Sequence, residues 1–201
     1  MDSREQLLHA AIKVYSVSGV RGATTKRIAQ EAGVNEVTLF RHFGSKDVLM
    51  QEALRWKAQA LFTSTLPVEP VDPYAELLAF AQNHYDALSK HRDLIRVSMG
   101  EFAEHPEATQ MACREAEDMD QAMRAYLARL REKGWASGEW DLNAATSMLL
   151  GTLFSDVMGR DCMPQCYPFS PEEGVRQYVA LFLRSIGADV HVPVPARAAH
   201  S

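Results

Sequence analysis

A short stretch of polar side chains between Gly33 and Gly44 contains the residues best suited to bind another molecule. Glycine commonly ends helices, so the segment predicts a single helix of about nine residues. Leu39 and Phe43 are four residues apart and can anchor one face of this helix to a core. The remaining faces then carry amide, carboxylate, hydroxyl, guanidinium and imidazole groups and one valine: Asn35, Glu36, Val37, Thr38, Arg41 and His42. Such donors and acceptors, with an apolar group to match a thymine methyl, suit a helix that contacts base edges in the major groove of DNA.

The elements before this helix support the same interpretation. A long helix is predicted from Ser3 to Gly19, and a short one from about Thr25 to Ala32, where Thr25 is expected to act as a cap. Two short helices joined by a tight turn with glycine, set against a longer helix, describe a helix-turn-helix. In that motif the second helix enters the major groove with its N-terminal end first.

The rest of the chain also shows helical spacing, and we find no alternation typical of strands. Further helices are expected at about 46–64, 73–89, 92–103, 106–133, 142–159 and 171–186, several of them preceded by capping residues such as Ser45, Asp72, Asp141 and Ser170. The fold class is therefore all-α with about nine helices. We expect a helix-turn-helix domain over residues 1–48, a helical domain over 49–187, and a disordered tail over 188–201.

Composition limits the function classes. The chain of 201 residues has a net charge of −5, but the charge is unevenly distributed: residues 1–57 have a net charge of +3 and the remaining residues −8. This distribution is expected when only the N-terminal part binds a polyanion. The N-terminus lacks signal-peptide features and no run of 18 apolar residues occurs, so we expect a cytoplasmic location without membrane contact. We find no catalytic motif and expect no enzyme activity, no metal site and no cofactor. Cys162 and Cys166 could sense oxidants or bind a thiophilic metal, although two free thiols are the simpler interpretation.

Residues 23–49 (ATTKRIAQEAGVNEVTLFRHFGSKDVL) resemble the signature of the TetR family of bacterial transcriptional regulators. The features that match in register are the Thr-Thr opening, Ile-Ala-x-x-Ala-Gly-Val, Thr-Leu-Phe-x-x-Phe and Gly-Ser-Lys-x-x-Leu. The resemblance covers about residues 5–55 and implies an all-α homodimer that binds DNA through its N-terminal part and a ligand through its C-terminal part. It implies a repressor that a small apolar or aromatic effector releases from a near-palindromic operator. A transcriptional activator or a ligand-independent regulator remains an alternative.

The resemblance also implies roles for individual residues. Thr25 and Lys26 would hold phosphate at the start of the second helix, and Lys46 would hold phosphate at the start of the fourth. Asn35, Glu36, Val37 and Thr38 would lie closest to base edges, while Arg41 and His42 would contact phosphate or a base at the groove margin. Two positions depart from the family pattern. Phe40 stands where a tyrosine often binds phosphate, and Val37 stands where a smaller residue is common.

The last two helices and the middle helices supply the other predicted sites. Apolar residues with helical spacing near the C-terminus are the expected dimer interface, a four-helix bundle made with a second copy: Leu149, Leu153, Val157, Val175, Tyr178, Val179 and Phe182. Adaptable apolar and aromatic side chains, with a few polar ones, are the expected effector site: Phe80, His84, Met99, Phe102, Met119, Met123, Tyr126, Leu127, Thr152 and Ser155. Residues of both sets are equally compatible with a packed protomer core.

Overall fold

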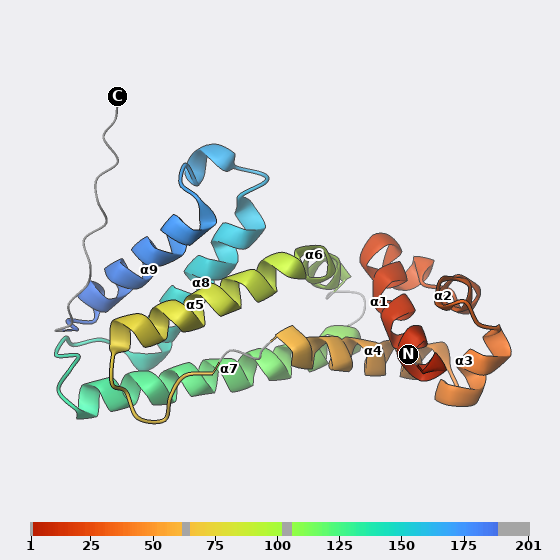
Figure 1. Ribbon diagram of the computed structural model, residues 1–201, viewed down its shortest axis with the longest axis horizontal. Helices are drawn as coiled ribbons and strands as arrows, with labels where there is room; N and C mark the ends of the chain where they lie inside the picture. Colours follow the sequence, from red (N-terminus) through yellow and green to blue (C-terminus); the bar gives the residue numbers. More distant parts are fainter. Residues whose placement is uncertain (1, 62–64, 102–105, 189–201) are drawn as a thin grey trace. The chain divides into compact units, whose positions relative to one another are not determined.

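The computed structural model of the chain describes residues 2–61, 65–101 and 106–188. These residues form nine α-helices, one short 3-10 helix and no strand (Figure 1). In chain order the helices are α1 (Ser3–Gly22), α2 (Thr25–Ala32), α3 (Glu36–Phe43), α4 (Lys46–Leu61), α5 (Pro73–Lys90), α6 (Arg92–Glu101), α7 (Pro106–Glu132), α8 (Leu142–Gly159) and α9 (Pro171–Ser185), with the 3-10 turn at Pro164–Cys166. The predicted all-helical fold is confirmed. Of the predicted tail, residues 189–201 lie outside the described residues, whereas the Ala188 N–H donates to the carbonyl of Leu183 at 2.9 Å.

Side-chain caps set where several of these helices begin. The capping oxygens accept hydrogen bonds of 2.9–3.3 Å from backbone N–H groups two or three residues ahead, and they belong to Thr24, Asn35, Ser45, Asp72, Asp141 and Ser170. The cap of α2 is therefore Thr24, and the prediction that Thr25 fills this role is wrong. Gly19, predicted to end the first helix, adopts φ 64° and interrupts α1, which continues for one more turn to Gly22.

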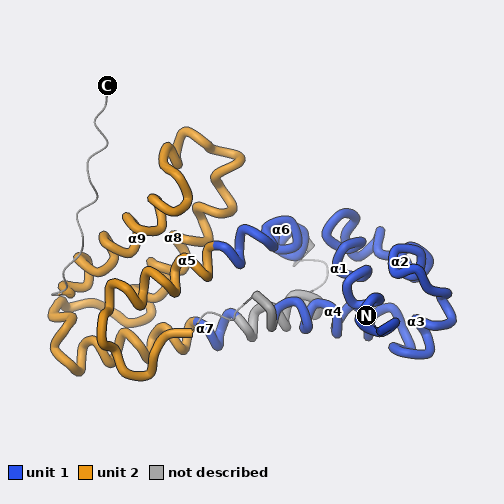
Figure 2. Tube along the Cα trace, in the orientation of Figure 1, with its two compact units in different colours: residues 1–63, 86–119 blue, residues 64–85, 120–201 orange. Residues whose placement is uncertain are grey.

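Backbone contacts divide the chain into two compact units (Figure 2). Unit 1 consists of Met1–Thr63 and Asp86–Met119, and unit 2 consists of Ser64–Tyr85 and Asp120–Ser201. Two of the three boundaries between the units fall inside α5 and α7, so each of these helices contributes to both units. The predicted domain boundary after residue 48 falls inside α4. The structure instead places the first three helices in one unit with α4 and α6.

The core of unit 1 is assembled around α1, which packs against α2, α3, α4 and α6. Its buried side chains include Leu7, Leu8, Ala11 and Tyr15 from α1, Ile28 from α2, Leu39 and Phe43 from α3, Leu49 and Ala53 from α4, and Leu94 from α6. The Tyr15 hydroxyl also donates to the Ser98 hydroxyl of α6 at 3.4 Å. The short helices α2 and α3 are thus held on a scaffold of longer ones, which fixes the orientation of their exposed faces.

Unit 2 is built from the first part of α5, the end of α7, and α8 and α9, which pack against each other. Its buried residues include Leu77 and Phe80 of α5, Met123, Tyr126, Leu127 and Leu130 of α7, Leu149, Leu153 and Val157 of α8, and Val175, Val179, Phe182 and Leu183 of α9. The apolar spacing of these helices is therefore used largely for packing within the protomer.

A buried carboxylate ties α5, α8 and α9 together inside unit 2. The Asp156 carboxylate accepts hydrogen bonds from the Tyr85 hydroxyl at 2.8 Å and the Tyr178 hydroxyl at 2.6 Å. Arg160 donates to both carboxylate oxygens and also to the carbonyl of Phe169. Burial alone would raise the pKa of the Asp156 carboxyl, but the hydrogen bonds from Arg160, Tyr178 and Tyr85 outweigh it and lower that pKa. The charge is therefore retained and paired, and it fixes how α9 lies on α8.

Candidate nucleic-acid interface

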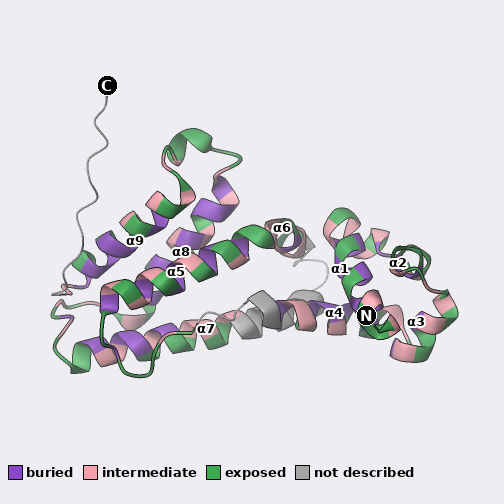
Figure 3. Ribbon diagram, viewed as in Figure 1, coloured by how far each residue is buried: buried purple, intermediate pink, exposed green. Residues whose placement is uncertain are grey.

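The helix α3 is anchored by two buried residues, and several of its other side chains are exposed. Leu39 is 0% exposed and Phe43 is buried beside it in the core of unit 1. In contrast, Val37 is 71% exposed and Phe40 is 47% exposed. Figure 3 shows α3 mainly in the colours of exposed and intermediate residues. Val37 and Phe40 are three residues apart on the helix, so together they form an exposed apolar surface that is suited to contact another molecule.

The N-terminal end of α3 lies beside that of α2. Gly33 adopts a left-handed conformation with φ 68°, and its N–H donates to the end of α2, which turns the chain sharply between the two helices. Asn35 Oδ1 accepts from the Val37 N–H at 3.1 Å and caps α3. Across the turn, the Thr25 hydroxyl donates to Glu36 Oε2 at 2.9 Å. The starts of α2 and α3 are therefore close together, and the Glu36 carboxylate lies at the N-terminal ends of both, where a negative charge is favoured.

Basic side chains lie on the same elements. Lys26 of α2 and Arg41 of α3 are exposed, as a phosphate-binding residue should be. Lys46, at the start of α4, donates from Nζ to the carbonyl of Val20 at 3.2 Å, so one of its three donor hydrogens is used to hold the end of α1. His42 is half-buried, and its Nε2 is shielded from solvent without a hydrogen-bond partner. This nitrogen cannot reach DNA in this conformation, which weakens the predicted contact of His42.

Two polar residues near this surface were not singled out from the sequence. Thr24 supplies the cap of α2, and the neighbouring Thr25 resembles it too closely for sequence alone to assign the cap. Arg27 Nη1 donates to the carbonyl of Gly22 at 3.0 Å and so joins the start of α2 to the end of α1. Its position next to Lys26 was the available signal. All ten predicted DNA-binding residues thus belong to unit 1, and nine of them lie at α2, α3 or the cap of α3.

The predicted effector residues differ in burial and in the unit to which they belong. Five of them are buried in the interior of unit 2: Phe80, His84, Met123, Tyr126 and Leu127. Met99 is exposed and belongs to unit 1, Ser155 is exposed, Met119 and Thr152 are partly buried, and Phe102 lies outside the described residues. The five buried positions are packed in the protomer core, and a role of the ten residues in effector binding stays a prediction.

Two polar groups are nevertheless placed within this interior. The ring of His84 stacks on that of Phe80 with centroids 5.9 Å apart, and burial lowers the pKa of His84 to about 4. The Tyr126 hydroxyl donates to Glu76 Oε2 at 2.7 Å, and burial, followed by this hydrogen bond, raises the pKa of Tyr126. Both groups are uncharged at neutral pH, so they add neutral polar groups to an otherwise mainly apolar part of unit 2, apart from the Asp156 network.

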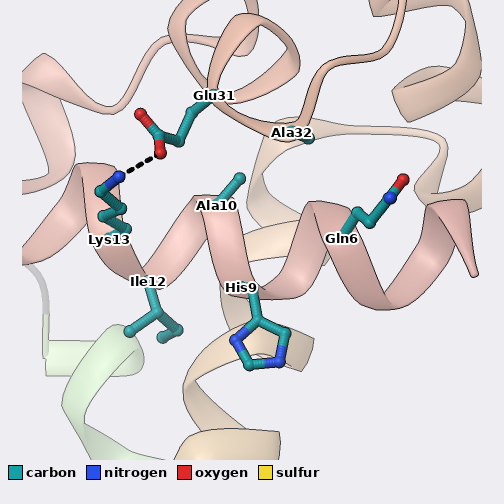
Figure 4. Close-up of a pocket in the computed structure, with 7 residues that line it drawn as sticks. All are labelled: Gln6, His9, Ala10, Ile12, Lys13, Glu31 and Ala32. Carbon is teal, nitrogen blue, oxygen red and sulfur yellow. Dashed lines mark hydrogen bonds and ion pairs between the residues drawn. The ribbon is translucent and has the colours of Figure 1, made fainter. Parts of the chain in front are cut away.

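A cavity of about 450 Å³ does occur in unit 1, between α1 and α2 (Figure 4). It is shallow, and its lining mixes short apolar residues with an ion pair between Lys13 and Glu31 that spans it. The other lining residues are Gln6, His9, Ala10, Ile12 and Ala32. None of the predicted effector residues lines this cavity, and its polar rim does not match an apolar effector.

The predicted dimer residues are also placed inside the protomer. Six of the seven are buried against their own chain: Leu149, Leu153, Val157, Val175, Val179 and Phe182. Tyr178 is partly buried and its hydroxyl is bonded to Asp156. These six side chains are covered within the protomer, where α8 and α9 pack against each other. The exposed apolar residues of the two helices are instead Met148, at 45%, and Leu181, at 59%.

Neither a metal site nor a membrane-spanning helix is found in the described parts of the chain. No group of three or more His, Cys, Asp or Glu side chains is placed to hold an ion there. No helix among the same residues combines the length and hydropathy that crossing a bilayer requires. Cys162 and Cys166 are both exposed and form no disulfide.

Comparisons with known proteins agree with the geometry of α1–α4. Residues 7–53 match the model of the family described as bacterial regulatory proteins, tetR family. The chain is 28% identical over 188 residues to the uncharacterized HTH-type transcriptional regulator YvkB of Bacillus subtilis, which covers 93% of this chain and 98% of YvkB. The chain is also similar to the tetracycline repressor protein class A from transposon 1721 of Escherichia coli, with 27% identity over 133 residues. This match covers 66% of the chain and 56% of the relative.

A solved structure shares the fold over nearly the whole chain. The transcriptional regulator FadR from Bacillus subtilis, in complex with stearoyl-CoA, superposes with a TM-score of 0.71 and covers 90% of this chain and 98% of FadR. Sequence identity is 18%, so the similarity bears on the fold alone.

Proposed function

Because the chain belongs to the TetR family of bacterial transcriptional regulators, we propose that it is a repressor that binds a near-palindromic operator as a homodimer. We further propose that a small apolar or aromatic effector releases it from DNA, and that it works in the cytoplasm, where the operator is. The observation that carries the proposal is the placement of α3, which is anchored by two buried residues and otherwise open. The division into a DNA-binding part, residues 1–48, and a ligand-binding and dimerisation part, residues 49–187, belongs to the same proposal.

The exposed side chains of α3 supply the proposed base contacts. Glu36 accepts from an exocyclic amino group, for which cytosine is the usual partner, and Val37 packs on a thymine methyl. Asn35 and Thr38 lie on the same end of the helix and add donors and acceptors. Lys26 and Arg41 are exposed and bind phosphates, which fixes the register of the helix without reading sequence.

Dimerisation is proposed to use the exposed faces of α8 and α9. Ala144, Met148, Gly151 and Ser155 are exposed on α8 with spacings of four, three and four residues, so they form one stripe. Leu181 is the large exposed apolar residue of α9. Small residues beside a methionine allow close approach of a second helix pair, and a two-fold axis would then build a four-helix bundle. Such a dimer can hold two α3 helices one DNA turn apart, about 34–36 Å.

The effector is proposed to enter the interior of unit 2. That interior is apolar, contains the adaptable Met123, and offers His84 and Tyr126 as neutral polar groups. The FadR structure supports the idea that this fold can hold a long apolar ligand, since it contains stearoyl-CoA. Because the interior is packed, the effector must bind a more open conformer, and it shifts the population only by its greater affinity for that conformer.

The coupling to DNA is proposed to pass through α4 and α6. Both helices pack against α1 within unit 1, and α6 contributes Leu94 to the same core that anchors α3. A displacement of α4 or α6 would therefore change the orientation of α2 and α3. In a dimer this alters the separation of the two reading helices and weakens one half-site.

Selection of DNA fragments from a random duplex library tests the DNA-binding part. The expected result is a near-palindromic sequence with half-sites one helical turn apart, and footprinting should show protection of both halves. Sedimentation should give a dimer. An asymmetric single half-site, or no selected sequence at moderate salt, would overturn the proposal.

A matched pair of variants tests the interface. Leu181→Glu places a charge on the exposed face of α9 and is expected to give a folded monomer with strongly reduced operator affinity. Val71→Glu alters a residue of unit 2 that is even more exposed, at 78%, but lies outside α8 and α9, and should remain a dimer. A Leu181→Glu variant that remains dimeric would exclude this face.

Native mass spectrometry of the purified protein and operator-release titrations test the effector. Long-chain acyl-CoA and tetracycline are suitable first probes because they represent an apolar chain and a polycyclic molecule. A true effector should release labelled operator and also stabilise the protein, by about 2.7 kcal/mol at one hundred times its Kd. Operator binding that no co-purified or added apolar molecule alters would favour the ligand-independent alternative.

A further inference from the structure

The hydrogen bond between Thr25 and Glu36 joins the two helices that would face DNA. Thr25 is the first residue of α2 and Glu36 is the first residue of α3, eleven positions later. The tight turn at Gly33 brings these helix starts together, and Thr25 Oγ1 lies 2.9 Å from Glu36 Oε2. Both residues are partly buried, so this contact is better shielded from solvent than the exposed side chains around it.

The chemistry of the two groups fixes the direction of the bond. An ionised carboxylate only accepts, so the single hydroxyl proton of Thr25 must be donated to Glu36. A DNA phosphate oxygen also only accepts. The Thr25 hydroxyl therefore cannot hold Glu36 and donate to phosphate at the same time, although the family resemblance implies a phosphate contact at this position.

The start of α2 has other groups for a phosphate. The Thr24 hydroxyl accepts from the Arg27 N–H at 3.3 Å and leaves earlier N–H groups of the first turn outside the helical ladder. Lys26 is exposed and carries a positive charge on the same turn. Phosphate binding at this helix start can thus proceed through backbone N–H groups and Lys26 while the Thr25 hydroxyl remains on Glu36.

We propose that Thr25 is a positioning residue whose hydroxyl holds the Glu36 carboxylate in place to accept a hydrogen bond from one base amino group in the major groove. With Oε2 engaged by Thr25, Oε1 is the oxygen presented to DNA. It accepts from the amino group of cytosine, and it repels the O6 and N7 acceptors of guanine and the O4 acceptor of thymine; adenine also offers an amino group, but beside an N7 acceptor that repels the carboxylate. The inference rests on the proposed function and adds to it the means by which one base pair is discriminated.

Operator variants measure the discrimination. The base pair read by Glu36 is the one whose preference is lost in Glu36→Ala, and each variant protein is titrated against all four pairs at that position. Wild type should prefer its own pair by about 10- to 150-fold, the range expected for a single hydrogen bond to a charged group. Thr25→Val removes the hydroxyl but keeps the shape, and should reduce this preference at least fivefold. Thr25→Ser keeps the hydroxyl and should retain it.

The double variant separates positioning from a phosphate contact. If Thr25 acts through Glu36, Thr25→Val should have no further effect in the Glu36→Ala background, because the group that it positions is gone. If the hydroxyl binds phosphate instead, Thr25→Val should weaken binding to every sequence by one factor in both backgrounds. That uniform loss would overturn the inference, as would an unchanged base preference in Thr25→Val.

Glu36→Gln gives a second measurement that keeps the wild-type Thr25. The Thr25 hydroxyl can still donate to the amide oxygen, and the amide nitrogen then faces the bases as a donor. The preferred base should change from cytosine to one that presents an acceptor, such as adenine or guanine. An unchanged preference contradicts the inference. If wild type selects an operator but no base pair responds to Glu36→Ala, the inference fails while the proposed function stands; if no operator is selected, both fail.

Discussion

Replacement of neighbouring apolar residues of α3 by alanine should separate stability from DNA binding. Leu39 is 0% exposed and belongs to the core of unit 1, whereas Val37 is 71% exposed. Leu39→Ala leaves a cavity and should lower the free energy of unfolding by about 2–5 kcal/mol. Val37→Ala removes two methyl groups, worth about 0.8 kcal/mol each when fully buried, of which less than a third is covered in the free protein. Its cost to stability should be about 0.5 kcal/mol.

The effect on DNA affinity should have the opposite order. If the exposed part of Val37 is buried against a thymine methyl, Val37→Ala should cost about 1 kcal/mol of binding free energy for each protomer. A dimer that engages two half-sites then loses about 2 kcal/mol, or roughly thirtyfold in Kd. Leu39→Ala should retain operator affinity to the extent that it remains folded, because Leu39 has no surface to offer DNA.

Urea unfolding followed by circular dichroism gives the stability change, and fluorescence anisotropy with labelled operator gives the affinity. The affinity assay must be run at a temperature where Leu39→Ala is still folded. The reasoning is refuted if Val37→Ala destabilises the protein by more than about 1.5 kcal/mol, since the residue would then be part of the core. It is equally refuted if Val37→Ala binds operator as tightly as wild type.

Three further outcomes follow from individual side chains. Phe40→Tyr adds a hydroxyl to an exposed ring and should tighten binding to operator and unrelated DNA alike, by about two- to tenfold in filter binding, with Phe40→Leu as the control. Burial lowers the pKa of His84 to about 4, so the folded state resists protonation of this ring. The contribution of the neutral ring to the free energy of unfolding is therefore fully present above pH 6.5. That free energy should fall by up to about 3 kcal/mol as the pH drops towards 4. In thermal melts, the stability of His84→Phe should fall less steeply with decreasing pH, and the more exposed His91 should account for a smaller remaining loss. An equally steep loss of stability in His84→Phe would show that His84 is not the group responsible. Asp156→Asn leaves Arg160 without its partner charge and should destabilise unit 2 by about 3–5 kcal/mol in urea, whereas a loss below about 1 kcal/mol would mean that the network is not structural.

Much of the fold was predictable because the signals are local. A helix is specified by apolar spacing over three or four residues, and its start by a capping oxygen two or three residues before the N–H that it binds. Asn35, Ser45, Asp72, Asp141 and Ser170 all act as predicted. The error at Thr25 arose because two adjacent threonines offer the same chemistry, and only the backbone shows which hydroxyl reaches the Arg27 N–H.

The faces of α8 could not be assigned in this way. Apolar residues occupy more than one side of this helix, so Met148 and Leu149 are adjacent and equally suited to a core or an interface. The structure buries Leu149 and leaves Met148 exposed. The buried Asp156 lies on the apolar stripe of the same helix, and only the structure shows that it is the centre of the network that fixes α9.

By itself the sequence determined the helices, the helix-turn-helix and the character of α3, since each depends on interactions between residues a few positions apart. Tertiary structure decided which apolar stripes are filled, which histidine is kept neutral, and that the Thr25 hydroxyl is committed to Glu36 rather than left for phosphate. These properties depend on groups that are distant in the chain and meet only when the helices pack, so no local pattern can encode them.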